Sequence, residues 1–198
     1  MRQLALEISP PPRPTLENFV PGLNAELLAR LADFRKGSFR ESVLYLWGET
    51  GSGKSHLLSA CAGPQVVDDV ESLDEPSQIA LFNAINEARQ SGGTVLAAGN
   101  APPAQLPLRE DLKSRLAWGL VYQVKRLTDE ERAQFLRAEA ARRGMHVPEE
   151  VIGYLLSHVR RDLPTLASIL DGLDRASLEL KRPVTLPLLK EALKDMQG

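Results

Sequence analysis

Residues 48–55, Gly-Glu-Thr-Gly-Ser-Gly-Lys-Ser, constrain the fold most, because this phosphate-binding pattern needs a strand before it and a helix after it. The run before it, residues 43–47, is apolar and typical of a buried strand, and residues 56–62 are typical of a helix. Glycines let backbone N–H groups turn inward around a phosphate, and the helix N-terminus adds partial positive charge. We therefore predict that Lys54 neutralises the outer phosphates of a nucleotide and that Ser55 holds Mg²⁺. The alternative, a chance glycine-rich turn, is disfavoured by the flanking strand and helix.

Composition and charge exclude several classes of protein. The chain has 198 residues, enough for one domain or two small ones, and its 43% hydrophobic and 25% charged residues are ordinary for a soluble globular protein. A net charge of −2 argues against a nucleic-acid binder that relies on bulk charge. The single cysteine, Cys61, excludes an internal disulfide and fits a reducing cytoplasm. Without an apolar run of about 18 residues or a secretion signal, we expect a cytoplasmic protein with no membrane contact.

The hydrophobic pattern divides the chain into three parts. Residues 1–14 carry four prolines and no helical period, so we expect an extended, mobile tail. Residues 15–126 alternate apolar runs with helical patterns, which predicts an α/β fold with a parallel sheet and helices on both faces. Residues 127–198 are helical throughout, which predicts a small bundle that begins with Thr128 as a helix cap. The expected strands are 43–47, 65–68, 94–99 and 120–124, and the expected helices are 24–35, 54–62, 76–90, 109–117, 128–143, 148–159, 163–180 and 185–196.

A second candidate element is the strand-end sequence Val66-Val67-Asp68-Asp69. An apolar strand that ends in two carboxylates is typical of a Walker B element. Asp68 would hold Mg²⁺, and Asp69 would orient or deprotonate the attacking water, since a carboxylate stays ionised at neutral pH. The alternative is an ordinary strand end, and the phosphate loop upstream favours the functional interpretation.

Two polar residues extend the candidate site. Asn100 follows the apolar run 94–99, where a sensor of the γ-phosphate would sit, and the alternative is a turn before two prolines. Arg115 lies near the end of an expected helix, placed to reach the nucleotide of a neighbouring subunit as an arginine finger does. The alternative is a solvated surface arginine. We expect Leu116 and Trp118 to anchor this segment in the core while Arg115 points outward.

Six stretches carry a resemblance to a known family. They are residues 16–24 (LENFVPGLN), 44–48 (LYLWG), 68–71 (DDVE), 102–106 (PPAQL), 114–119 (SRLAWG) and 173–177 (LDRAS). On these the chain resembles the AAA+ ATPases of the DnaA clade, and within it the DnaA regulatory inactivators of the Hda type. The resemblance implies an AAA+ P-loop sheet followed by a small all-α lid. The SRLAWG stretch is specific to the clade, where its arginine is the finger.

The resemblance implies roles for individual residues. Bound ADP (or ATP) would be held by Gly48, Gly51, Gly53, Lys54, Ser55, His56 and Asn100, with Mg²⁺ on Ser55 and Asp68. Asp69 would be catalytic, and Arg115 would act in trans on ATP bound to DnaA. The chain would then activate its partner's ATPase, with at most weak hydrolysis of its own. Because the chain ends after the helical bundle, we expect it to lack the DNA-binding domain of an initiator.

The tail resembles a peptide that docks on the bacterial β sliding clamp. Residues 3–8, Gln-Leu-Ala-Leu-Glu-Ile, present a glutamine amide and apolar anchors. Gln3, Leu4, Leu6 and Ile8 would fill a preformed groove and connect the protein to DNA indirectly through the clamp. The alternative is an ordinary amphipathic N-terminus or a first strand, and the Hda-type resemblance favours the clamp peptide.

The first departure from the family pattern is a short connection. Only Gly63 and Pro64 separate the helix 54–62 from the strand 65–68, where the family has a further strand and helix. Either the protein lacks this segment or the sequence as written omits it. We favour omission, since the loss would expose a strand edge. Without the segment, the family's sheet order becomes 120–124, 43–47, 94–99, 65–68.

The second departure is in the lid. Pro164 stands where the family places an arginine that touches the nucleotide phosphates, and Arg161 would have to substitute from a different direction. We therefore expect less phosphate contact from the lid. Three other functions stay open, namely a DnaC-like helicase loader, a stand-alone AAA+ ATPase, and an adaptor in which the nucleotide is structural. A homo-oligomer also stays open.

Overall fold

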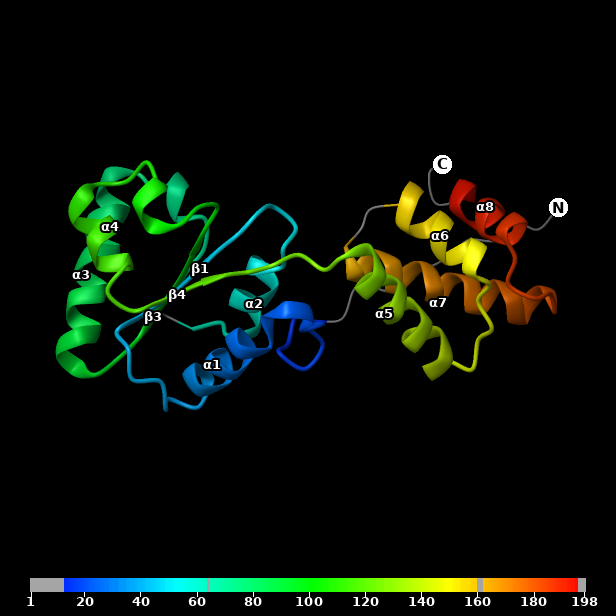
Figure 1. The fold of residues 1–198 in the computed structure, drawn as a ribbon, viewed down its shortest axis with the longest axis horizontal. Coiled ribbons are helices and arrows are strands. Elements are labelled where there is room, and N and C mark those ends of the chain that lie inside the picture. The colour runs from blue at the N-terminus through cyan, green and yellow to red at the C-terminus, as the bar shows by residue number, and fades with distance from the viewer. Residues whose placement is uncertain (1–12, 64, 160–161, 196–198) are drawn as a thin grey trace. The chain divides into compact units, whose positions relative to one another are not determined.

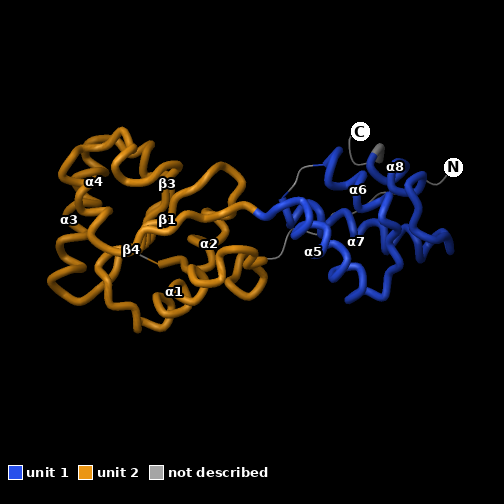
Figure 2. Tube along the Cα trace, in the orientation of Figure 1, with its two compact units in different colours: residues 1–12, 127–198 blue, residues 13–126 orange. Residues whose placement is uncertain are grey.

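The computed structural model describes residues 13–63, 65–159 and 162–195 of the chain. The described residues form two compact units, one of residues 13–126 and one that begins at residue 127 (Figure 2). Each unit encloses a hydrophobic core of its own. The predicted clamp peptide, with Gln3, Leu4, Leu6 and Ile8, lies outside the described residues.

A four-stranded parallel sheet forms the centre of the first unit. Its strands are β1 (Val43–Trp47), β2 (Val66–Val67), β3 (Val95–Gly99) and β4 (Leu120–Gln123). They lie in the order β2-β3-β1-β4, and every neighbouring pair is parallel. This order confirms the one predicted for a sheet without the additional strand.

Helices cover both faces of the sheet, because the side chains of β1 alternate between two apolar layers (Figure 1). Val43 and Tyr45 pack with α3 (Glu75–Ser91) and α4 (Glu110–Leu116). Leu44 and Leu46 pack with α1 (Ala25–Arg35) and α2 (Lys54–Ala60) on the other face. A strand buried on both faces needs an unbroken apolar run, which is why the predicted strand 43–47 is correct. Short 3-10 turns occur at η1 (Gly22–Asn24), η2 (Val70–Ser72) and η3 (Pro103–Gln105).

The second unit is a bundle of the helices α5 (Asp129–Arg142), α6 (Glu149–His158), α7 (Leu163–Leu180) and α8 (Leu186–Asp195). Thr128 starts the bundle with a capping box, in which its side chain and that of Glu131 each accept a backbone N–H. The helix start predicted there is therefore confirmed, as is the small all-α unit. Among the described residues, none of the helices has the length and apolar character needed to cross a membrane.

The connection between α2 and β2 is short. No further strand or helix lies between α2 and β2 in the described residues, so the sheet has the four strands expected without the additional segment. The sequence predicts that the loss of this segment exposes a strand edge. However, β2 has only two residues, both half-buried, so the exposed edge is very short.

Candidate nucleotide site and the Arg115 face

The sheet topology brings three predicted site elements to one edge. The P-loop (residues 48–55) follows β1, Asn100 follows β3, and Asp68 and Asp69 follow β2. Trp47 pairs with Gly99 and Val67 pairs with Ala97, so these strands end at similar heights. Because β3 lies between β1 and β2, Asn100 is placed between the P-loop and the two carboxylates.

The backbone of the P-loop requires its glycines. Gly51 and Gly53 have φ of +79° and +100°, in the left-handed region that side chains other than glycine rarely adopt. Gly48 is confined by close approach, since a Cβ there would lie 2.6 Å from the carbonyl oxygen of Val124. All three glycines predicted to hold a nucleotide therefore have a conformational or steric reason to be glycine.

Lys54 and Ser52 show that the P-loop fits a bound phosphate. The Lys54 side chain is buried, and its Nζ donates to the carbonyl oxygens of Gly48 at 2.7 Å and Glu49 at 3.4 Å. No carboxylate pairs with Lys54 within the described part of the chain, so a buried cation is left with neutral partners. Ser52 Oγ is also buried and has no hydrogen-bond partner among the described residues. An anion inside the loop would satisfy both groups.

An N-terminal segment, residues 13–24, borders the P-loop, which the sequence reasoning did not foresee. The Phe19 ring lies so close to Gly53 that a Cβ there would approach within 2.7 Å of it. His56 Nε2 is 2.9 Å from the carbonyl oxygen of Thr15, and the His56 and Phe19 rings are 5.5 Å apart. His56, predicted to contact the nucleotide, thus holds this segment against α2. The only advance signal was that residues 16–24, which include Phe19, carry part of the family resemblance.

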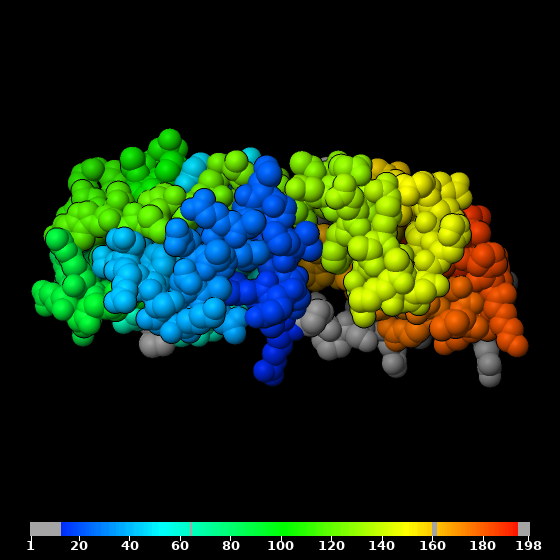
Figure 3. All heavy atoms as spheres, turned by 60° about the horizontal axis from the view of Figure 1, so that its bottom comes forward, coloured from blue at the N-terminus to red at the C-terminus, as the bar shows by residue number. Residues whose placement is uncertain are grey.

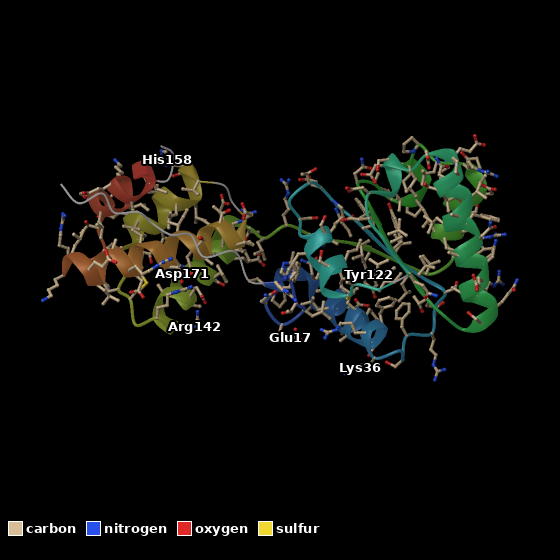
Figure 4. All side chains as sticks on the ribbon, turned by 180° about the vertical axis from the view of Figure 1, so that it is seen from behind. Glu17, Lys36, Tyr122, Arg142, His158 and Asp171 are labelled. Carbon is tan, nitrogen blue, oxygen red and sulfur yellow. The ribbon has the colours of Figure 1, made fainter. Side chains whose placement is uncertain are left out.

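Asn24 fixes the end of the same segment. Its buried side chain donates to the carbonyl oxygen of Lys125 at 2.9 Å and accepts the Lys125 N–H at 2.8 Å. This pair joins the N-terminal segment to the chain just after β4. In Figure 3 the blue residues of the segment and of α1 lie together on the surface of this unit. Tyr122, labelled in Figure 4, donates to Glu26 of α1 at 2.7 Å and strengthens the same connection.

The two Walker B carboxylates differ in their surroundings. Asp68 is half-buried, and its Oδ1 accepts the backbone N–H of Asp69 at 2.9 Å. Asp69 is exposed and has φ of +48°, an unusual backbone conformation for a non-glycine residue. The described residues contain no group of three His, Cys, Asp or Glu side chains that could bind a metal alone. A Mg²⁺ ion here would therefore depend on phosphate oxygens in addition to Asp68 and Ser55.

Asn100 is exposed at the end of β3. Its backbone N–H donates to Glu71 Oε2 at 3.3 Å, and its side chain makes no hydrogen bond that involves the described residues. The exposed side chain of Asn100 is therefore available to bind a ligand at this edge of the sheet.

Arg115 is held on the surface of the first unit by contacts from α3. Its Nε donates to Asn86 Oδ1 at 2.9 Å, and its guanidinium lies 3.6 Å from the centre of the Trp118 ring and 4.9 Å from that of Phe82. Leu116 is fully buried, as predicted, but Trp118 is 39% exposed, so the prediction that it anchors in the core is wrong. The physical reason is that Trp118 follows the end of α4 and stacks with two cations, Arg115 and Arg89.

Arg115 lies at the opposite edge of the sheet from the P-loop of its own chain. Gly119, which leads from α4 into β4, packs against the carbonyl group of Val43, the first residue of β1. The P-loop instead leaves the last residue of β1. The four steps from the first to the last residue of β1, at about 3.3 Å each, separate these two ends by roughly 13 Å. Arg115 therefore does not reach the nucleotide site of its own chain.

The second unit supplies no arginine at the position of Pro164. Pro164 is exposed in the first turn of α7, which is capped by Asp162 through the N–H of Thr165. Arg161 lies outside the described residues.

Ion pairs stabilise the second unit, and one of them joins the end of α5 to α7. Arg143 binds Asp171 at 2.7 Å, and Asp171 lies near Arg142 in Figure 4. Hydrogen bonding from Arg142, together with the charge of Arg143, lowers the pKa of the Glu139 carboxyl. These ion pairs stabilise the bundle.

The second unit matches a known domain family. Residues 129–193 match the family model described as "Hda, lid domain". This match covers α5 to α7 and most of α8, so the bundle is similar to the lid domain of that family.

Most of the chain has the fold of several proteins of known structure. It is similar to domain III of the replication initiation protein DnaA from Thermotoga maritima, with 24% identity, 94% of this chain and 98% of that chain covered, and a TM-score of 0.67. It is also similar to AMPPCP-bound DnaA from Aquifex aeolicus, with 20% identity, coverage of 88% and 70%, and a TM-score of 0.65. A third relative is the RuvB branch migration motor of Thermotoga maritima, with 16% identity, coverage of 91% and 71%, and a TM-score of 0.61.

Proposed function

We propose that this chain is an AAA+ protein of the DnaA/Hda type, a regulator of replication initiation that stimulates hydrolysis of ATP bound to DnaA, and its fold and the match of its lid support this proposal. The observation that carries the proposal is the position of Arg115. It is exposed in part, preorganised by Asn86 and Trp118, and remote from the P-loop of its own chain. A guanidinium in such a place serves a nucleotide only if that nucleotide belongs to another molecule.

The P-loop gives the protein its own nucleotide, which we propose to be ADP with Mg²⁺. Structural relatives include DnaA proteins with bound AMPPCP, which supports an adenine nucleotide. The glycines, Lys54, Ser55 and Asn100 would hold the phosphates, and Ser55 and Asp68 would hold Mg²⁺. Asp69 would align water, but with Pro164 in the lid we expect slow hydrolysis in cis. The bound nucleotide mainly supplies charge that neutralises Lys54 and orders the loop.

The partners follow from this assignment. Arg115 would enter the ATP site of DnaA, and the peptide Gln3, Leu4, Leu6 and Ile8 would bind the β sliding clamp and so bring the protein to replicated DNA. Hydrolysis on DnaA would then be tied to clamps loaded on DNA, which would block re-initiation. We place this activity in the cytoplasm.

The decisive experiment combines ATP-loaded DnaA, DNA-loaded clamp and this protein, and measures the ADP formed. Arg115→Ala should remove most of the stimulation, since an arginine supplied in trans contributes roughly 10³–10⁵ in rate. Arg115→Lys should rescue poorly, because a point charge does not reproduce the planar fork. Arg89→Ala is the matched control, since Arg89 stacks on the same Trp118 ring, whereas the hydrogen bond to Asn86 comes from Arg115. Undiminished stimulation by the Arg115→Ala protein would refute the assignment.

Other variants separate the rival functions. Lys54→Ala should strongly weaken ADP binding, and unchanged affinity by calorimetry would exclude the P-loop as the site. Deletion of residues 1–8 should abolish clamp binding, and a chain that instead captures the replicative helicase would be a DnaC-like loader. Rapid turnover by the isolated protein would indicate a stand-alone ATPase. Stimulation that is independent of Arg115 would indicate an adaptor with a structural nucleotide.

A further inference from the structure

Arg126, the last residue of the first unit, lies on the outer turn of the P-loop. Its Nη1 is 3.0 Å from Glu49 Oε2, and its Nη2 donates to the carbonyl oxygen of Thr50. A Cβ on Gly51 would lie 3.8 Å from Nη2, so the guanidinium covers three successive residues of the loop. Neither the loop motif nor the family resemblance pointed to this residue.

The contacts that hold Arg126 in this place are weak ones. The side chains of Arg126 and Glu49 are 46% and 75% exposed, and an ion pair so open to water contributes little to stability. A phosphate is a stronger acceptor for a guanidinium, because two parallel N–H groups can bind two of its oxygens. Arg126 can therefore leave Glu49 at little cost when a better anion is close.

The P-loop itself offers a single cation to a nucleotide. Residues 48–55 contain one, Lys54, and the first turn of α7 carries Pro164 where a phosphate-contacting arginine was expected. Lys54 already donates to carbonyl oxygens of the loop, and Arg126 donates to the carbonyl oxygen of Thr50. Lys54 and Arg126 are thus both held by backbone carbonyl oxygens of the loop that is proposed to bind the phosphates.

We propose that Arg126 is a phosphate-binding residue of the nucleotide site, held on Glu49 and Thr50 until the phosphates of ADP draw its guanidinium away. Glu49 then acts as a competitor that lowers affinity for the nucleotide. This inference rests on the proposed binding of ADP, and it adds a residue to that site. It differs from a purely structural role, in which Arg126 and Glu49 would together shape the loop.

The test compares the affinities of the parent protein and three variants for ADP–Mg²⁺ and for inorganic pyrophosphate, both by calorimetry. Arg126→Ala should weaken both ligands by about 10- to 100-fold, the value of a charged hydrogen-bonded contact. Arg126→Lys should recover part of the loss. Glu49→Gln should bind ADP more tightly than the parent, because the competing carboxylate is gone. Circular dichroism spectra verify that each variant is folded.

The sign of the Glu49→Gln effect distinguishes the two roles. If Glu49→Gln and Arg126→Ala weaken ADP alike, the pair only shapes the loop and the proposal is wrong. It is also wrong if Arg126→Ala binds ADP as the parent does, an outcome that leaves the proposed function intact. A parent protein that binds no ADP would overturn the nucleotide assignment and this inference with it.

Discussion

Gly53→Ala tests the contact between Phe19 of the N-terminal segment and the P-loop. Gly53 has φ of +100°, and an alanine in such a conformation costs about 1–3 kcal/mol. The new Cβ would also lie 2.7 Å from Cε2 of Phe19, well inside the usual 3.5–4.0 Å separation of carbon atoms. Overpacking of this kind costs about 1–3 kcal/mol. We therefore expect the free energy of unfolding of the first unit to fall by about 2–6 kcal/mol.

Urea unfolding followed by tryptophan fluorescence measures this loss, because both tryptophans of the chain, Trp47 and Trp118, belong to the first unit. Gly92→Ala is the matched control, since Gly92 has φ of +74° but nothing within 4 Å of a new Cβ. It should lose only the backbone contribution. A double mutant with Phe19→Ala should recover about 1–3 kcal/mol of the loss through the relieved contact. If Gly53→Ala costs no more than Gly92→Ala and shows no coupling with Phe19, the described seating of Phe19 is incorrect.

Three further variants or treatments address other parts of the chain. Asn24→Ala should lower the free energy of unfolding by about 2–4 kcal/mol, because it leaves the N–H and C=O of Lys125 without their partner, and a loss below about 1 kcal/mol in urea would contradict this. Leu155→Ala, in the core of the lid, should lower the free energy of unfolding of the lid by about 2–5 kcal/mol. Leu178→Ala, at a 70% exposed position, should change this free energy by less than about 0.5 kcal/mol, and far-UV circular dichroism measures both. Burial raises the pKa of the Cys61 thiol to about 11, so iodoacetamide at pH 8 should alkylate the native protein far more slowly than the urea-unfolded chain, and equal rates would disprove the burial.

The parts of the fold that local sequence determines were predictable. The P-loop is a local signal, because its glycines, Lys54 and Ser55 are adjacent in the chain and lie between a strand and a helix. The start of the lid at Thr128 is equally local, since a capping box involves residues three positions apart. The sheet order came from the family resemblance, and its four strands agree with it.

The contacts that sequence reasoning missed join residues that are distant in the chain. Phe19 meets Gly53, and Arg126 meets Glu49, only after the sheet has formed. Trp118 was assigned to the core on hydrophobicity alone, but an aromatic face also attracts cations, and Arg89 and Arg115 keep it at the surface. The period of hydrophobic residues along the chain does not reveal contacts between residues that are distant in sequence. Asn86, which orients Arg115, was missed for the same reason.

The presence of two separate cores has a consequence for calorimetry. A chain whose units each bury their own apolar residues need not melt in one cooperative step, so a single melting temperature does not describe it. A ligand stabilises only what it binds, and a hundredfold excess over Kd contributes about 2.7 kcal/mol. ADP on the P-loop would move the endotherm of residues 13–126 upward and leave that of the lid in place. Heat capacity recorded at increasing ADP concentration would thus assign each endotherm to its unit.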